Sequence, residues 1–252
     1  MSGKNYFMVE KTDAIATIYF NRAEKRNAIS LGMWTEIGRL VQEMEADRTI
    51  KVLILRGIDE TAFAAGADIS EFPTLRYDSD SAKKYNDELL KAEAMLAECS
   101  KPTIAMIQGY CVGGGCELAV ACDLRFSDTT GKFGITAAKL GQVYNLPGTK
   151  YLVDLVGPAK AKDILFSGRL MDAQEALQIG LIDRLYSPQE IVAKTYEYAN
   201  LVAKNAQIAV RGSKRIIREI CFGETREHGE IEQMILSSFN SDDYKEGVTA
   251  FL

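Results

Sequence analysis

Histidine is almost absent from this 252-residue chain: His228 is the only one, and it lies in the charged stretch TREHGEIE. A histidine-rich metal site and an H-E-x-x-H zinc site are therefore excluded. A Ser-His-Asp triad would need His228, which lies far along the sequence from any glycine-flanked serine. The chain also lacks C-x-x-C, Walker A and G-x-G-x-x-G motifs, which disfavours thiol-redox, P-loop and nicotinamide chemistry.

Positive charge is also in short supply, because 30 basic residues face 35 acidic ones and the formal net charge is −5. This balance predicts no nucleic-acid partner. No run approaches ~18 uninterrupted apolar residues, so no membrane partner is expected. The first residues, MSGKNYFMVEKTD, lack the apolar core of a targeting peptide, and we expect a cytoplasmic location. The five cysteines stand mostly in apolar runs and are expected to be reduced, buried thiols.

Short apolar runs alternate with helical patterns over the first two-thirds of the chain. Strands are predicted at Ala14–Phe20, Val52–Arg56 and Thr103–Gln108, since these runs are apolar and bounded by turn residues. Helices are predicted from a Ser30 cap to about Ala46 and near Ser79–Glu98. Buried strands separated by helices favour an α/β layered core with parallel strand pairing.

From about Gly148 onward the pattern is mostly helical. The segment from Asp172 to Glu175 resembles a capping box, and Gly180 suits the end of that short helix. Three amphipathic segments are predicted between Gln189 and Leu252. We expect one continuous architecture, with a core over residues 1–190 and a helical region over 191–252 that folds back over the core or packs against another subunit.

Two glycine-containing stretches are the places where chemistry is expected. In FAAGADISEF (Phe63–Phe72), Gly66 allows a sharp turn whose exposed amides could bind an anion or a developing oxyanion. A tight strand-to-helix connection capped by Asp68 explains the same residues without a function.

The second stretch, IQGYCVGGGCELAVACD (Ile107–Asp123), runs from a buried strand through three glycines into an apolar helix. Free amides at that helix start favour negative charge. Glu117 is the only residue between Gly109 and Asp123 that normally carries a charge at pH 7, and burial there would raise its pKa and suit proton transfer. A carboxylate that merely compensates the helix dipole is the alternative. Together the two turns indicate a site that polarises a carbonyl group and stabilises an enolate or a tetrahedral oxyanion.

At these residues the sequence resembles the crotonase (enoyl-CoA hydratase/isomerase) superfamily. The resemblance covers nearly the whole chain and rests on five ordered segments: NRAEKRNAIS (Asn21–Ser30), AFAAGADISEF (Ala62–Phe72), GYCVGGGCELAVACDLRF (Gly109–Phe126), GRLMDAQEALQIGLID (Gly168–Asp183) and DDYKEGVTAFL (Asp242–Leu252). It implies a spiral of ββα units with a C-terminal helical region, assembled as homotrimers or hexamers. It also implies an acyl-CoA substrate, with coenzyme A as part of that substrate and neither a separate cofactor nor a metal.

The resemblance assigns roles to individual residues. The backbone N–H groups of Ala67 and Gly114 match the family's oxyanion hole, and Glu117 matches its first catalytic glutamate. Residues matched to the coenzyme A path and its phosphates are Ala65, Asp68, Ile69 and Ser70, together with Lys25 and Arg26. The residues up to Leu252 do not include the family's closing basic tail, so no phosphate contact from such a tail is expected.

One departure affects the expected reaction. Family hydratases carry a second glutamate where this chain has Ala137, which cannot transfer a proton. The segment LGQVYNLPG resembles methylmalonyl-CoA decarboxylases, which place a tyrosine at Tyr144 and a substrate-contacting residue at Thr136. Decarboxylation forms an enolate without a base, and a decarboxylase acting on a small acyl-CoA is the first hypothesis. A hydratase using only Glu117 and a non-catalytic coenzyme A-binding relative are the alternatives, and Tyr144 could simply fill the pocket.

Overall fold

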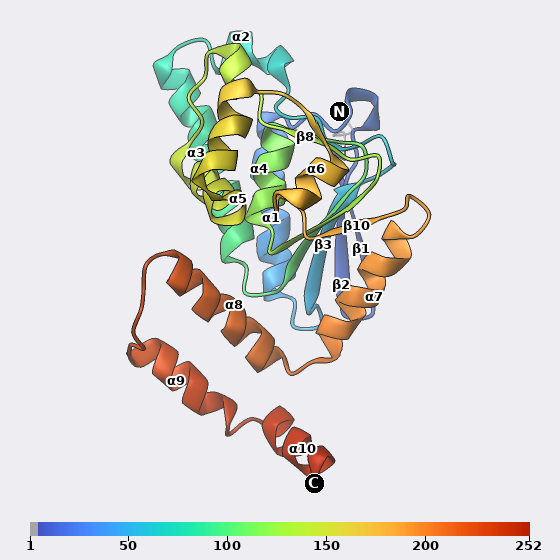
Figure 1. The fold of residues 1–252 in the computed structure, drawn as a ribbon, viewed down its shortest axis with the longest axis vertical. Coiled ribbons are helices and arrows are strands. Elements are labelled where there is room, and N and C mark those ends of the chain that lie inside the picture. The colour runs from blue at the N-terminus through green and yellow to red at the C-terminus, as the bar shows by residue number, and fades with distance from the viewer. Residues whose placement is uncertain (1–4) are drawn as a thin grey trace.

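The computed structural model describes residues 5–252, which form two sheets and the helices around them (Figure 1). The strands are β1 (Phe7–Thr12), β2 (Ile15–Phe20), β3 (Val52–Gly57), β4 (Ala62–Ala64), β5 (Thr103–Ile107), β6 (Tyr110–Val112), β7 (Leu124–Asp128), β8 (Lys132–Gly134), β9 (Met171–Asp172) and β10 (Arg184–Tyr186). The helices are α1 (Leu31–Ala46), α2 (Phe72–Leu75), α3 (Ser79–Glu98), α4 (Gly114–Ala121), α5 (Leu146–Ser167), α6 (Ala173–Gln178), α7 (Ile191–Lys204), α8 (Gln207–Cys221), α9 (Gly229–Ser238) and α10 (Asp242–Phe251).

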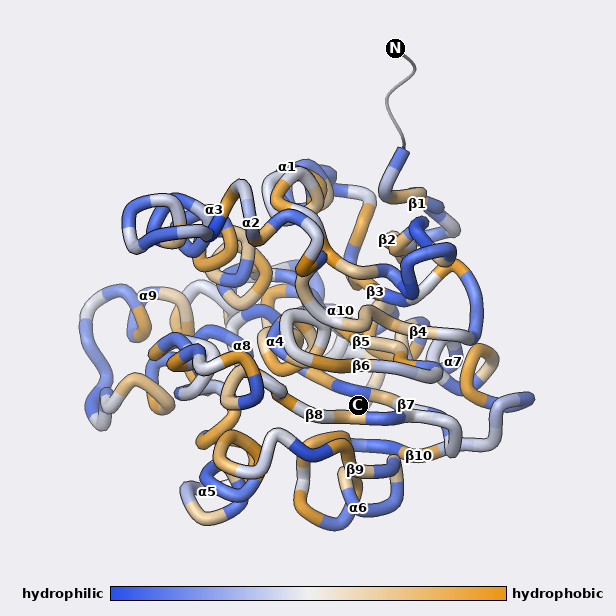
Figure 2. Tube along the Cα trace, turned by 90° about the horizontal axis from the view of Figure 1, so that it is seen from above, coloured by the Kyte–Doolittle hydropathy of each residue, from blue (hydrophilic) through white to orange (hydrophobic). Residues whose placement is uncertain are grey.

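Successive ββα units divide their strands between the two sheets. One sheet has the order β1-β2-β3-β5-β7-β10 and the other β4-β6-β8-β9, so β3, β5 and β7 lie in one and β4, β6 and β8 in the other. Figure 2 shows the units following one another from β1 to β10. The pairs from β2 to β10 in the larger sheet are parallel, and only the edge strand β1 pairs antiparallel. The predicted parallel α/β core and the spiral of ββα units are confirmed.

Helices cover the larger sheet on both sides, and its central strands are accordingly buried along nearly their whole length (Figure 1). Alternate residues of β3 belong to two separate apolar clusters: Leu53 and Leu55 pack with α1 and α3, whereas Val52 and Ile54 pack with α7. Helix α7 is thus part of the packing of the core, although it follows residue 190. The division into residues 1–190 and 191–252 stays a prediction.

The short helix α6 confirms half of the expected capping box. The Asp172 carboxylate accepts a hydrogen bond from the Glu175 amide at 2.8 Å and caps the helix. The return bond is absent because the Glu175 carboxylate is held by Arg169 instead. Gly180, with φ of +81°, follows the last turn as predicted.

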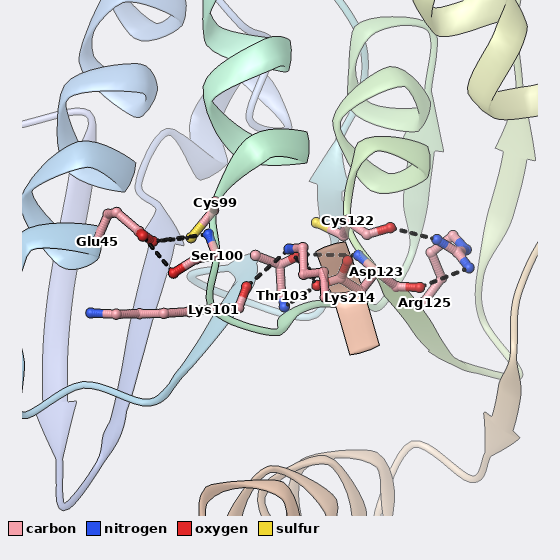
Figure 3. Close-up of polar contacts among 9 residues, drawn as sticks. All are labelled: Glu45, Cys99, Ser100, Lys101, Thr103, Cys122, Asp123, Arg125 and Lys214. Carbon is pink, nitrogen blue, oxygen red and sulfur yellow. Dashed lines mark hydrogen bonds and ion pairs between the residues drawn. The ribbon is translucent and has the colours of Figure 1, made fainter. Parts of the chain in front are cut away.

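The C-terminal part contains four helices, α7 to α10, where the sequence pattern predicted three amphipathic segments. Helices α8 to α10 extend away from the sheets (Figure 1). A polar cluster attaches α8 to the core, because Lys214 donates to the Lys101 carbonyl at 3.0 Å and to the Asp123 carboxylate at 2.7 Å (Figure 3). No helix among the described residues is long and apolar enough to cross a membrane.

Candidate active site

The two glycine turns predicted to carry the chemistry lie side by side. Strands β4 and β6 are parallel neighbours, with Ala64 opposite Cys111, so the turns that follow them leave the same end of the smaller sheet. A Cβ atom built on Gly113 would lie 3.6 Å from the Gly66 Cα. Gly66 itself has φ of +107°, a conformation that other residues rarely adopt. The glycines therefore permit a close approach of two backbone segments.

A loop from the N-terminal part of the chain holds the first turn in place. Buried Asn27 donates from Nδ2 to the Ala62 carbonyl at 2.7 Å. The backbone of Ile29 donates to the Gly66 carbonyl and accepts from the Asp68 amide, both at 2.8 Å. These bonds fix the direction in which the intervening residue 67 presents its own amide.

The amides of Ala67 and Gly114 are available for a ligand. A Cβ atom on Gly114 would lie 3.7 Å from the Ala67 nitrogen, so the two residues face the same small space. Within residues 5–252, neither amide donates a hydrogen bond to another group of the protein. Gly114 is the first residue of α4, where the amide also carries the positive end of the helix dipole. This pair has the features of an oxyanion hole.

Glu117 lies one turn further along α4 and is only 3% exposed. Burial raises the pKa of its carboxyl group to about 7. Hydrogen bonding from Asn145 and the positive charge of Arg76 act in the opposite direction and favour the carboxylate. The expected burial and raised pKa are confirmed, and they leave the group able to accept or release a proton near neutral pH.

Asn145 orients Glu117. Its Oδ1 accepts a hydrogen bond from the Gly148 amide at 2.7 Å, which caps α5 and turns Nδ2 toward the Glu117 Oε1 atom, to which it donates. A Cβ atom on Gly148 would lie 3.2 Å from that Oε1 and 3.1 Å from Tyr144 Cε1. The glycine therefore lets α5 approach Glu117 and Tyr144 closely.

A cavity of about 120 Å³ joins these groups. Eight residues singled out from the sequence line it: Ala65, Ala67, Ile69, Gly114, Glu117, Thr136, Ala137 and Tyr144. Alanine at position 137 thus stands in the cavity where a second glutamate was expected from the family pattern. The Tyr144 hydroxyl is buried and forms no hydrogen bond of standard geometry in the described part of the chain, but it lies close enough to Glu117 to favour the carboxylate of that residue.

Four other residues predicted to contact coenzyme A lie outside this cavity. The Asp68 carboxylate is occupied by Arg22 at 2.7 Å, by Lys25 at 3.7 Å and by the Ser70 hydroxyl at 2.6 Å. It also caps the short 3₁₀ helix Ile69–Glu71, which confirms the capping role that the sequence suggested for Asp68 as an alternative to ligand binding. Arg26 is exposed and stacks on the Tyr110 ring at 5.1 Å. Contacts of Lys25, Arg26, Asp68 and Ser70 with coenzyme A stay predictions.

Sequence reasoning missed two charged residues near Glu117. Arg76 follows α2 and lines the same cavity. Glu93 on α3 is 1% exposed, and neither of its carboxyl oxygens has a hydrogen-bond partner among the residues described. Burial, and to a lesser extent the charge of Glu117, raises the pKa of Glu93 to about 9. The only sequence signal for Glu93 was a glutamate at a position on the apolar face of α3.

Over the described chain, no cluster of three or more His, Cys, Asp or Glu side chains could hold a metal ion.

Comparison with known proteins agrees with this fold and site. The Enoyl-CoA hydratase/isomerase family model matches residues 10–252. The crotonyl-CoA hydratase of Syntrophomonas wolfei is 33% identical over 97% of this chain and 94% of its own length. The short-chain-enoyl-CoA hydratase of Clostridium acetobutylicum is 33% identical over 98% of this chain and 95% of its own. A crystal structure of an enoyl-CoA hydratase/carnithine racemase from Magnetospirillum magneticum superposes with a TM-score of 0.95 at 37% identity, covering 99% of this chain and 93% of that one.

The fold and the paired amides thus define a protein of the crotonase class. The chain belongs to the enoyl-CoA hydratase/isomerase family, and it is an acyl-CoA enzyme of the lyase type.

Proposed function

We propose that the protein is a hydratase of short enoyl-CoA thioesters that works with one carboxylate, Glu117. The observation that carries this proposal is the position of Glu117, with a pKa near 7, in the same cavity as the free amides of Ala67 and Gly114. The similarity to hydratases from Syntrophomonas wolfei and Clostridium acetobutylicum supports it. The decarboxylase hypothesis has no such support among the relatives.

The chemistry balances with a single carboxylate. Glu117 accepts a proton from water as the water oxygen bonds to the β-carbon of the enoyl group. The electron pair of the double bond moves toward the thioester oxygen, and the amides of Ala67 and Gly114 stabilise the resulting enolate. Glu117 then returns the proton to the α-carbon, so that water has been added and the carboxylate is regenerated. Ala137 takes no part in this sequence, which explains how alanine is tolerated there.

The size of the cavity supports a short acyl group. About 120 Å³ is less than the ~150 Å³ of an engineered cavity that binds benzene. A four- or five-carbon acyl chain suits this space, whereas a long fatty acyl chain would need side chains to move.

Crotonyl-CoA tests the proposal. We expect the purified protein to consume the enoyl thioester, followed by its ultraviolet absorbance, and to form 3-hydroxybutyryl-CoA. The Gly114→Ala variant should lose about 10²-fold in kcat/KM, because its Cβ atom would lie 2.9 Å from the buried Trp34 ring, so that the Gly114 amide has to shift from its position beside the Ala67 amide. Gly32→Ala is the matched control, since its Cβ atom would meet only the Ser30 hydroxyl at 3.9 Å. Full activity of Gly114→Ala would contradict an oxyanion hole at this position.

Decarboxylation is the second candidate because of Tyr144. Its buried hydroxyl forms no hydrogen bond of standard geometry among the described residues and could donate to a departing carboxylate of the substrate. Incubation with methylmalonyl-CoA, with carbon dioxide and propionyl-CoA measured as products, separates the candidates. Hydration of crotonyl-CoA without decarboxylation rejects the second candidate, and carbon dioxide release without hydration rejects the first.

We further propose that the chain assembles as a homotrimer or as a hexamer made of two trimers. Helices α8 to α10 expose large apolar side chains, which a second copy of the chain could cover: Ile217, Ile220, Phe222, Leu236, Phe239 and Tyr244. Light scattering coupled to gel filtration should give three or six times 27.8 kDa. A monomeric mass at micromolar concentration would refute the assembly.

A further inference from the structure

Arg76 places a positive charge in the candidate active-site cavity. The residue directly follows α2, and its guanidinium lies against the rings of Phe72 and Tyr85, 4.7 and 4.8 Å from their centroids. Nη2 donates to the Asn86 Oδ1 atom at 3.0 Å. The aromatic contacts and this single bond set the plane of the guanidinium and leave its other N–H groups free of side-chain acceptors.

No carboxylate of the described residues pairs directly with this charge. Among residues 5–252, Arg76 forms no ion pair within 4.0 Å. Glu117 is the nearest acidic influence on it, but Glu117 is bonded to Asn145 and titrates near neutral pH. Six of the other twelve arginines form an ion pair among the described residues, as Arg22 does with Asp68 and Arg125 with Asp183. Arg76 is therefore a half-buried cation in the lining of this cavity; Glu117 acts on it at longer range, but no carboxylate of the described residues forms an ion pair with it.

A half-buried guanidinium is costly unless it meets an anion, because burial removes water from the charge. Its planar array of N–H groups fits a carboxylate through two parallel hydrogen bonds. A neutral hydrocarbon chain would gain nothing from this group. The cavity is thus better matched to an acyl group that itself ends in, or carries, a negative charge.

We infer that the acyl group of the substrate carries a carboxylate, which Arg76 binds, so that the preferred substrates are CoA thioesters of short dicarboxylic acids. This inference rests on the proposed acyl-CoA function and specifies its substrate class. Arg76 acts as a specificity residue in it, because it contacts the part of the acyl group that does not react.

Paired ligands test the inference. Glutaconyl-CoA is crotonyl-CoA with a carboxyl group added to the terminal carbon of its acyl chain. Glutaryl-CoA is related in the same way to butyryl-CoA. We expect kcat/KM to be at least tenfold higher for glutaconyl-CoA than for crotonyl-CoA. Calorimetry should show glutaryl-CoA binding at least tenfold more tightly than butyryl-CoA. In the Arg76→Met variant, both ratios should fall at least tenfold.

The control variant is Arg39→Met, which removes an exposed guanidinium and should leave both ratios unchanged. If Arg76 only supports Glu117 or the packing of α3, Arg76→Met will weaken both members of each pair equally, and the inference is wrong. A wild-type preference for the uncharged ligands also overturns it. The binding measurement separates the two proposals. If the protein binds glutaryl-CoA more tightly than butyryl-CoA but turns over neither enoyl thioester, the hydratase proposal is refuted and the inference that the substrate carries a carboxylate is supported.

Discussion

Replacement of Glu117 by glutamine is expected to lower kcat for crotonyl-CoA hydration by 10²- to 10⁴-fold, the usual contribution of a general acid–base group. Glutamine keeps the shape of the side chain, and its carbonyl oxygen can still accept the bond from Asn145. The loss would therefore reflect proton transfer rather than misfolding. Glu43→Gln on the exposed part of α1 serves as the control. Activity of Glu117→Gln within tenfold of the wild type would remove Glu117 from the mechanism.

The same group predicts a pH dependence. Below its pKa of about 7, Glu117 is protonated and cannot accept a proton from water. Above that pH it is a carboxylate and can do so. The kcat/KM for crotonyl-CoA should therefore rise with pH and level off above about 7, and the residual activity of Glu117→Gln should lack this rise. A flat wild-type profile between pH 5 and 8 would contradict the assignment.

Replacement of Glu93 by methionine is expected to stabilise the protein. The Glu93 carboxyl is buried and unpartnered, which costs free energy that an apolar side chain of similar length avoids. At pH 8 we expect the free energy of unfolding to increase by about 2 kcal/mol or more, measured by urea titration. Glu88→Met on the same helix is the control, because the carboxylate of Glu88 has a hydrogen-bond partner in Thr35.

The sign of the pH effect follows from the raised pKa of Glu93. In the unfolded chain this carboxyl loses its proton above about 4.5, whereas in the folded protein it keeps the proton until about 9. The unfolded state therefore binds fewer protons over this range, and the wild type loses stability as pH rises through it. The gain from Glu93→Met should be smallest at pH 5 and grow toward pH 9. A gain that is independent of pH would show that Glu93 is not held protonated.

Local patterns explain what the sequence alone could predict. The glycine turns and the lone Glu117 stand within short segments, and each carries its chemistry in consecutive residues. The parallel sheet was predictable because β2, β3 and β5 are rich in apolar residues on both faces. In the same way, the Ser30 cap of α1 lies where the pattern placed it.

Arg76 and Glu93 could not be found in this way. Both precede Glu117 in the chain by more than twenty residues, and they come near it only because α3 packs against α4 and α2 packs against α3. No local rule fixes that packing. Asn145 was missed for a related reason: its position before Pro147 indicates a helix cap, but its bond to Glu117 depends on the approach of α5 at Gly148.

The neighbouring placement of β4 and β6 has a consequence for how the enzyme can change. Ala67 and Gly114 occupy corresponding places in consecutive repeats, each just beyond the second strand. Their separation derives from the ~4.8 Å spacing of adjacent strands, a property of peptide geometry rather than of any side chain. A substitution at Arg76 can therefore redirect substrate choice while the two donors keep their distance, so that recognition and enolate stabilisation can evolve separately.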